Sequence, residues 1–304
     1  MPGPGGSPTG DVPVRAIGLM VLSTLLFTVM HALVRDITDS IHPFEVAFFR
    51  NLFGLLVVVP FVVREGLAVL RTERLPLHGV RAVLNAAGML LFFFGLSAAP
   101  LATVTALSFT APIFLTVLAM LFLGESVRLR RWSAILLGFA GAVVVLRPTG
   151  ASVGPGEIAT LCSSVVWAGA LLVIKILGRT ERSVTIITYM SLLMMPITLT
   201  AALFHWTWPT AQELAVLVGI GILGSAGQLV MTQALKEAEA SVVMPFDFFK
   251  LIWAALIGYL LFAEVPDLWT WVGGAMIFGS AVYIARRERR LGGSPTGPAP
   301  GSHG

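Results

Sequence analysis

Ten long apolar runs dominate the sequence, and they constrain the fold more than any other feature. Each has roughly the 20 residues that a helix needs to cross a bilayer. Charged residues make up 12% of the chain, too few to cover the surface of a soluble protein. The sequence therefore predicts an all-α integral membrane protein with ten transmembrane helices. The runs cover residues 14–34, 44–63, 79–97, 101–123, 131–147, 156–178, 184–204, 211–234, 240–263 and 267–285.

An internal repeat divides these runs into two sets of five. A shift of 139–140 residues places Phe27 over Trp167 and Leu101–Glu125 over Ala240–Glu264. Because five is an odd number, the second copy must enter the membrane from the opposite side, so the two repeats are inverted, as in many secondary transporters. The expected parts are a disordered tail over 1–13, a first five-helix repeat over 14–147, a second over 148–287, and a disordered tail over 288–304.

The lysines and arginines lie beside the apolar runs and do not form one basic patch. Along ten spans, sixteen of them fall on the side of both termini and three on the other side, while Lys250 lies inside a span. The positive-inside rule therefore predicts a multi-pass protein of the bacterial inner (plasma) membrane with both termini in the cytoplasm. We expect the lipid bilayer as its partner, and no nucleic acid.

Motifs of enzymatic chemistry are missing from the sequence. It contains no Gly-Lys dipeptide and hence no phosphate-binding loop, and it contains no His-Glu-x-x-His. Its one cysteine, Cys162, is expected to be a small buried side chain, and no cysteine pair is available for zinc or a disulfide. We therefore expect no enzyme activity, no cofactor and no metal site.

The fourth and fifth runs carry the motifs that resemble a known family. Pro112-Ile113-Phe114 and Phe122-Leu123-Gly124-Glu125, followed by Trp132, Gly138 and Gly141, are similar to the EamA-type transporters of the drug/metabolite transporter superfamily. The resemblance covers roughly residues 14–287. In the second half, Phe249-Lys250-Leu251 stands where the family often has Glu-Pro, and Ala263-Glu264 replaces Gly-Glu.

This resemblance implies a secondary transporter that exports small organic metabolites by alternating access. The ten-helix layout in one chain looks most like the bacterial exporters of aromatic and other neutral amino acids. An exporter of drugs or other metabolites of the same superfamily is an alternative. A passive channel is another, although the sequence lacks the rings of identical polar groups that a channel needs. We expect a monomer with a small-molecule substrate, and both coupling to protons and passive exchange stay open.

Charged and aromatic side chains inside the spans are the candidate contacts to that substrate. Asp247 and Lys250 lie three residues apart in the ninth run, and a charge at mid-bilayer is costly unless it is paired or hydrated. His31 can titrate near neutral pH, and Trp167 can stack on a flat substrate. Each also has a structural reading, as an ion pair, a packed ring or an interhelical hydrogen bond. The candidates are Phe27, His31, Asn85, Trp167, Gln228, Phe246, Asp247 and Lys250.

Arg50 and Glu45 form a further charged set near the start of the second run. We expect these two side chains to make a structural ion pair at the rim of the membrane, outside the substrate path.

Overall fold

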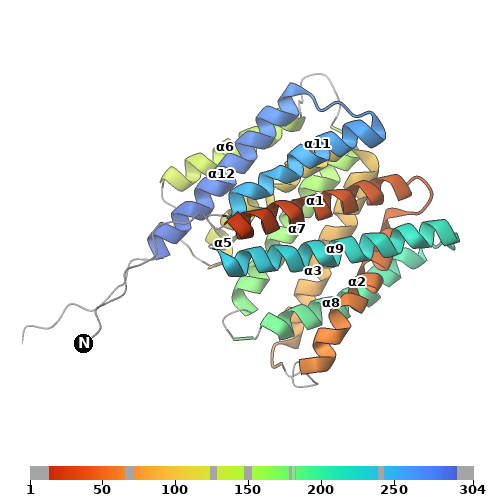
Figure 1. Cartoon of the computed structure of the whole chain (residues 1–304). Helices are drawn as coiled ribbons and strands as arrows, with labels where there is room; N and C mark the ends of the chain where they lie inside the picture. Colours follow the sequence, from red (N-terminus) through yellow and green to blue (C-terminus); the bar gives the residue numbers. More distant parts are fainter. Residues whose placement is uncertain are drawn as a thin grey trace, which may run out of the picture.

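The computed structural model is a bundle of helices, described for residues 14–65, 72–123, 129–146, 153–177, 180–181, 183–238 and 243–292 (Figure 1). The predicted all-α fold with ten spans is confirmed, because α4 with α5 form the fourth span and η2 with α11 form the ninth. The elements are α1 (Val14–Ile37), α2 (Pro43–Glu65), α3 (Leu75–Ala98), α4 (Leu101–Ser108), α5 (Ala111–Leu123), α6 (Leu129–Leu146), α7 (Pro155–Leu177), α8 (Ser183–Leu203), α9 (Ala211–Glu237), the 3-10 helix η2 (Met244–Phe248), α11 (Phe249–Phe262) and α12 (Leu268–Gly292).

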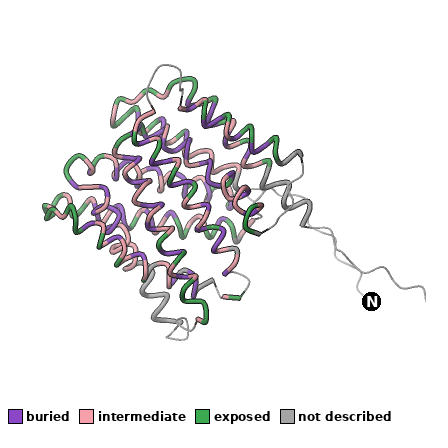
Figure 2. Tube along the Cα trace, turned by 180° about the vertical axis from the view of Figure 1, so that it is seen from behind, coloured by how far each residue is buried: buried purple, intermediate pink, exposed green. Residues whose placement is uncertain are grey.

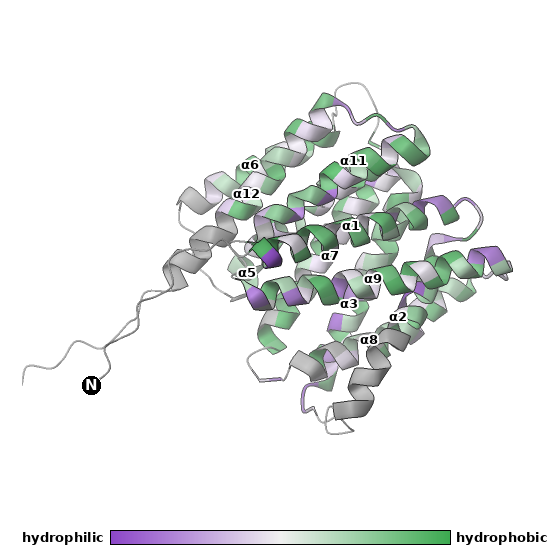
Figure 3. Cartoon of the chain, in the orientation of Figure 1, coloured by the Kyte–Doolittle hydropathy of each residue, from purple (hydrophilic) through white to green (hydrophobic). Residues whose placement is uncertain are grey.

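The outer surface of the bundle is apolar, as expected of a protein that faces lipid. Six helical stretches of the described chain are long and apolar enough to cross a membrane, and three shorter apolar helices accompany them. Hydrophobic residues run along the helices (Figure 3), and exposed residues recur along them (Figure 2). Large apolar residues such as Phe122 and Leu260 are exposed. In water this exposure would be unfavourable, so the fold requires a bilayer around it.

Helix packing confirms the inverted repeat. α1 packs along α9, and α3 packs along α7. Exchanging the two repeats turns the first of these pairs into the second, because α1 corresponds to α7 and α3 to α9. Corresponding helices also meet each other, since α2 packs on α8 and α6 on α12 (Figure 1). The corresponding fourth and ninth spans meet as well, through α4 and α11. These contacts are those of a pseudo-twofold axis that relates the two halves.

The fourth span is interrupted at Phe109 and Thr110, between α4 and α5. Pro112, at the second position of α5, has no N–H group, and its ring would clash with the carbonyl group four residues earlier if the helix were continuous. Thr110 donates its hydroxyl to the Leu107 carbonyl at 2.7 Å. This bond satisfies one of the carbonyl groups that the interruption leaves without a helical partner.

Two expectations about single segments need correction. α12 continues to Gly292, past the predicted end of the repeat at 287, because no glycine or proline interrupts the chain between Gly279 and Gly292. The predicted tail over 1–13, and the rest of the C-terminal tail, lie outside the described residues.

Cys162 is exposed, so the prediction of a buried thiol is wrong. Ser163 and Ser164, the next two residues of α7, are buried. Successive residues of a helix point about 100° apart, so Cys162 faces outward beside these buried neighbours.

The two ends of the bundle are named here by the arginines of α1. The Arg15 end is where α1 begins, and the Arg35 end is where α1 finishes. Because successive spans run in opposite directions, α3 and α11 also finish at the Arg35 end, where the segments 37–43, 98–101, 203–211 and 262–268 lie.

Candidate functional site

Each repeat places one large ring against a glycine of the other repeat. Trp167 of α7 lies against Gly88 of α3, so close that a Cβ atom at Gly88 would stand 2.7 Å from Trp167 Cδ1. Phe27 of α1 lies against Gly227 of α9, where an added Cβ would stand 3.3 Å from the ring. The two contacts correspond to each other in the repeat. The absence of a side chain at both glycines lets these rings enter the interface between the repeats.

Trp167 continues a row of rings that links both repeats. Its ring centroid lies 5.1 Å from that of Phe92 in α3, and Phe92 lies 5.0 Å from His31 of α1 in an edge-to-face arrangement. Phe92 is buried, whereas Trp167, His31 and Phe27 are each partly exposed. The structure thus joins two predicted site residues, His31 and Trp167, through Phe92. Sequence reasoning missed Phe92 because it stands in a run of three phenylalanines, in which nothing marks one ring as different.

The charged pair of the ninth span lies next to these rings. Lys250 Nζ is 2.6 Å from Asp247 Oδ1, and it lies 5.4 Å from the centroid of the Phe27 ring. The pair was expected within one regular helix. Instead, Asp247 belongs to the 3-10 helix η2 and Lys250 is the second residue of α11. Pro245, the second residue of η2, cannot donate a backbone hydrogen bond and so favours an irregular stretch here.

Arg50 does not pair with Glu45, which corrects the prediction of an ion pair at the rim. Glu45 is fully buried and accepts hydrogen bonds from the backbone N–H and the hydroxyl of Thr207, both at 3.1 Å. Arg50 turns toward the interior, where its Nη1 donates to Asn51 Oδ1 at 3.1 Å. Arg50 and Lys250 are both close enough to act electrostatically on His31. Sequence spacing favoured the local pair, since only the fold brings Thr207 to Glu45.

Three predicted residues stay apart from this group. Phe246 packs in an apolar cluster with Met20 and Val243 toward the Arg15 end. Asn85 donates its side-chain N–H to the Arg81 carbonyl of its own helix at 3.0 Å, and Gln228 is exposed. Below, the name central group stands for the residues that do come together: Phe27, His31, Arg50, Phe92, Trp167, Asp247 and Lys250.

Above the central group, an ion pair closes the Arg35 end. Arg35 pairs with Glu264, which follows α11, and its guanidinium also donates to the carbonyls of Leu96 and Ala99. Ala263 ends α11 with a φ of 53°, a left-handed conformation that favours glycine, and thereby turns the chain toward Arg35. The first and second repeats are thus tied together at this end.

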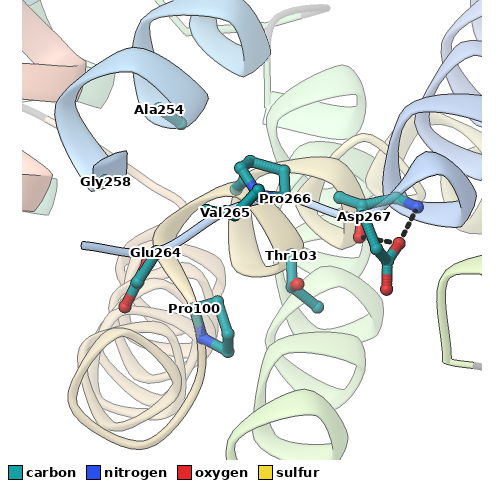
Figure 4. Close-up of a pocket in the computed structure, with 10 residues that line it drawn as sticks. Pro100, Thr103, Ala254, Gly258, Glu264, Val265, Pro266 and Asp267 are labelled. Atoms are coloured by element: carbon teal, nitrogen blue, oxygen red, sulfur yellow. Dashed lines mark hydrogen bonds between the residues drawn. The ribbon is translucent and has the colours of Figure 1, made fainter. Parts of the chain in front are cut away.

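A pocket of about 270 Å³ lies beside this ion pair (Figure 4). Its walls come from α4, α11 and the segment that leads into α12. Glu264 and Asp267 stand at the two ends of this segment, and Asp267 Oδ1 accepts from the Thr270 N–H at 2.8 Å at the start of α12 (Figure 4). In the part of the chain that the structure describes, no group of three or more His, Cys, Asp or Glu side chains could hold a metal ion.

The central group has the chemistry of a binding site for an organic molecule. Rings from α1, α3 and α7 offer stacking faces, and cations reach the same place from α2 and α11. Stacking between rings is favourable beyond the area that it buries, by about 0.5–1.5 kcal/mol for a pair. Because the group draws on both repeats, any movement of one repeat against the other changes its shape.

Comparison with known proteins agrees with this arrangement. The profile of the EamA-like transporter family matches the chain twice, over residues 14–147 and 154–286. One solved structure has a TM-score of 0.61 at 20% sequence identity, and the match covers 91% of this chain and 99% of that one. At this identity the likeness concerns the fold alone.

Several curated relatives are similar over nearly their whole length. A riboflavin transporter of Rhizobium johnstonii is 34% identical, over 89% of this chain and 91% of its own. An S-adenosylmethionine uptake transporter of Rickettsia bellii is 31% identical, over 90% and 94%. The pseudopaline exporter CntI of Pseudomonas aeruginosa is 28% identical, over 92% and 99%.

Proposed function

Because this chain belongs to the EamA-like transporter family, we propose that it is a secondary transporter for a small organic metabolite that contains a flat ring. The row formed by His31, Phe92 and Trp167 is the observation that carries this proposal. These rings come from both repeats and lie at the interface that rocking of the repeats opens and closes. Membership of a transporter family also agrees with the expectation that the chain is not an enzyme.

The nature of the relatives narrows the expected substrate. Their names refer to riboflavin, S-adenosylmethionine and pseudopaline, and the relatives reported above include no amino acid exporter. Riboflavin and S-adenosylmethionine both contain a flat, fused ring system rich in nitrogen. We therefore place such ring compounds ahead of aromatic amino acids such as tryptophan, which have a smaller ring and were the first expectation from the sequence.

The relatives include both uptake proteins and an exporter, so the direction of transport has to come from the driving force. Protons are one candidate driving force, and passive exchange is the alternative. A transporter coupled to protons would accumulate substrate when a pH gradient is imposed. A passive exchanger would carry the same substrate without accumulating it.

Orientation in the inner membrane is part of the proposal. The excess of positive charge supports an orientation with the Arg15 end and both termini in the cytoplasm. Cysteines introduced at Ser7 and Ser294 should both resist an impermeant thiol reagent added to intact cells. The exposed Cys162 must first be replaced by serine so that it does not react. Labelling of either terminus in intact cells would overturn this orientation.

Counterflow in proteoliposomes tests the transport function. Vesicles that contain the protein are loaded with unlabelled riboflavin, S-adenosylmethionine or tryptophan, and entry of the same labelled compound is measured. A saturable uptake that preloading stimulates supports a transporter and argues against a channel. Absence of stimulated uptake for every ring compound, by protein that is monodisperse in detergent, would contradict the proposal.

A further inference from the structure

We infer that Arg50 is a recognition site for a carboxylate of the substrate, beside the rings of the central group. The inference rests on the proposed function, and it deepens that function by naming a chemical class: an organic acid or zwitterion whose ring lies toward Trp167 and whose carboxylate reaches Arg50.

A chain of hydrogen bonds holds the Arg50 guanidinium in place from one side. Arg50 Nη1 donates to Asn51 Oδ1 at 3.1 Å, and Asn51 Nδ2 donates to Thr198 Oγ1 at 3.3 Å. Thr198 in turn donates to the Met194 carbonyl of α8 at 2.9 Å. Because the amide of Asn51 is anchored on α8, its oxygen has one orientation toward Arg50. Asn51 is therefore a positioning residue for the guanidinium.

On its opposite side, Arg50 approaches Gly224 of α9 closely, because glycine has no side chain. A Cβ atom at Gly224 of α9 would stand 3.3 Å from Arg50 Nε and 3.5 Å from Arg50 Nη2. Any larger side chain at this position would occupy the space next to these two donors. They are the edge of the guanidinium that offers two parallel N–H groups, the arrangement that binds both oxygens of a carboxylate.

Arg50 is also the cation of the central group that has no anionic partner among the described residues. Lys250 pairs with Asp247, and at the ends of the bundle Arg35 pairs with Glu264. Among the described residues, Arg50 makes one hydrogen bond, to the neutral Asn51. The fully covered side-chain atoms that lack a hydrogen-bond partner do not include the other nitrogens of Arg50. A guanidinium within a span is costly unless it is paired or hydrated, and an incoming anion would offset part of this cost.

Charge in the central group points to the same ligand. Asp247 neutralises Lys250, so Arg50 is the cation of the group whose charge is not compensated. His31 lies near both cations and brings no negative charge. A ligand that brings one negative charge would make the group neutral. The two cations of the central group occupy different places. Lys250 contacts the Phe27 ring, whereas Arg50 lies beside Gly224 and Met30.

Binding of benzoate compared with benzamide tests the inference without any transport. The two compounds have the same shape and differ in charge, and each is titrated against purified full-length protein while its thermal unfolding in detergent is followed. Wild type should bind benzoate at least tenfold more tightly than benzamide, as the loss of a hydrogen-bonded charge partner predicts. Arg50→Gln should bind both equally, and Arg50→Lys should keep part of the preference because it keeps the charge. Asn51→Ala should weaken benzoate binding alone.

Arg15→Gln is the matched control, because it removes one arginine from an exposed site at the other end of the bundle. It should leave the preference for benzoate unchanged. Equal binding of benzoate and benzamide by wild type, or a preference that survives in Arg50→Gln, would overturn the inference. A failure of ring-compound counterflow would instead contradict the proposed function and leave this readout untouched.

Uptake of indole-3-acetate compared with indole-3-acetamide extends the test to transport. Wild-type proteoliposomes should prefer the acid, and Arg50→Gln should lose that preference while still taking up the amide. Unchanged selectivity in Arg50→Gln would mean that the carboxylate is recognised elsewhere. A benzoate effect that requires added phosphatidylglycerol would point to a lipid headgroup at Arg50, and would also count against a substrate site.

Discussion

Arg35 of α1 and Glu264, the second residue after α11, form an ion pair that joins the two repeats. Glu264 also accepts a hydrogen bond from the Leu101 N–H at 2.9 Å, so the pair includes the start of α4. Alternating access requires the repeats to separate at each end in turn. In the proposed transport cycle these bonds break when the Arg35 end opens, and we expect their strength to set how often it does so.

Weakening this ion pair should favour the state that is open at the Arg35 end. Ala102, at the start of α4, is 3% exposed, so a cysteine there is protected while the end is closed. In an Ala102→Cys, Cys162→Ser background, Arg35→Gln should speed labelling by a thiol reagent several-fold. Arg35→Lys should have a smaller effect, since lysine keeps the charge but not the forked donors. Labelling at the same rate in all three proteins would mean that the ion pair does not control opening.

Replacing a glycine that faces one of the rings should lower uptake of ring compounds, whereas replacing a glycine that faces open space should not. Gly88→Ala should lower uptake of ring compounds most, because its Cβ would force Trp167 to move, and Gly227→Ala should have a milder effect on Phe27. Gly219→Ala, on α9, meets nothing within 4 Å and serves as the control. It should stabilise the protein by up to about 1 kcal/mol through helix propensity. Similar uptake by all three variants would exclude Trp167 and Phe27 from the substrate path.

The pair Asp247 and Lys250 can be tested for a role beyond structure. Lys250→Met leaves Asp247 without its partner, which costs roughly 3–5 kcal/mol for a buried pair. The double variant Lys250→Met with Asp247→Leu removes that penalty, so thermal stability should recover. We predict that transport does not recover, because Lys250 lies on the Phe27 ring at the central group. Flux near that of wild type in the double variant would make the pair purely structural.

Acid should loosen the contact between the segments before α2 and after α8. Burial, with a smaller effect from the stacked His205 at 3.8 Å, lowers the pKa of His42. Below the ordinary pKa of about 6.5 the unfolded chain binds a proton more readily than the folded one, so stability falls as the pH drops through this value. His42→Asn should make the melting temperature less dependent on pH between about 7.5 and 5.5. His42 Nδ1 accepts a hydrogen bond from the Phe44 N–H. The side-chain oxygen of asparagine can accept the same hydrogen bond.

Equal losses of melting temperature on acidification in wild type and His42→Asn would assign the pH dependence to other groups.

Much of this fold follows from the sequence because its determinants are local or repetitive. Apolar length locates the spans, and the odd number of spans in the repeat dictates inversion. The correspondence of Phe27 with Trp167 also identified the two rings of the site. The repeat does not tell how deeply each side chain is buried. Most positions of a span are apolar, and an apolar side chain can face lipid, a neighbouring helix or the substrate.

The errors concern contacts between segments distant in the sequence. Glu45 was assigned to Arg50 because the two are close in the sequence, but its partner Thr207 is brought in by the packing of α2 on α8. Phe246 and Lys250 were expected in one place, yet the irregular η2 turns Phe246 toward Met20. The departure from Gly-Glu at Ala263-Glu264 was visible in the sequence. The fold shows that the chain turns at this Ala263, with a φ of 53°, and that Glu264 then pairs with Arg35.

Counterflow of a ring compound by Trp167 variants tests the central claim most directly. Trp167 lies between Gly88 and the Phe92 ring, so Trp167→Phe retains a stacking face and Trp167→Ala leaves none. The assay uses proteoliposomes with equal amounts of folded protein. We predict that Trp167→Phe keeps most of the stimulated S-adenosylmethionine uptake and that Trp167→Ala loses at least nine-tenths of it. A tenfold loss corresponds to about 1.4 kcal/mol, the size expected for a lost stacking contact and its packing. Uptake by Trp167→Ala equal to that of wild type would contradict the claim that the substrate binds at these rings.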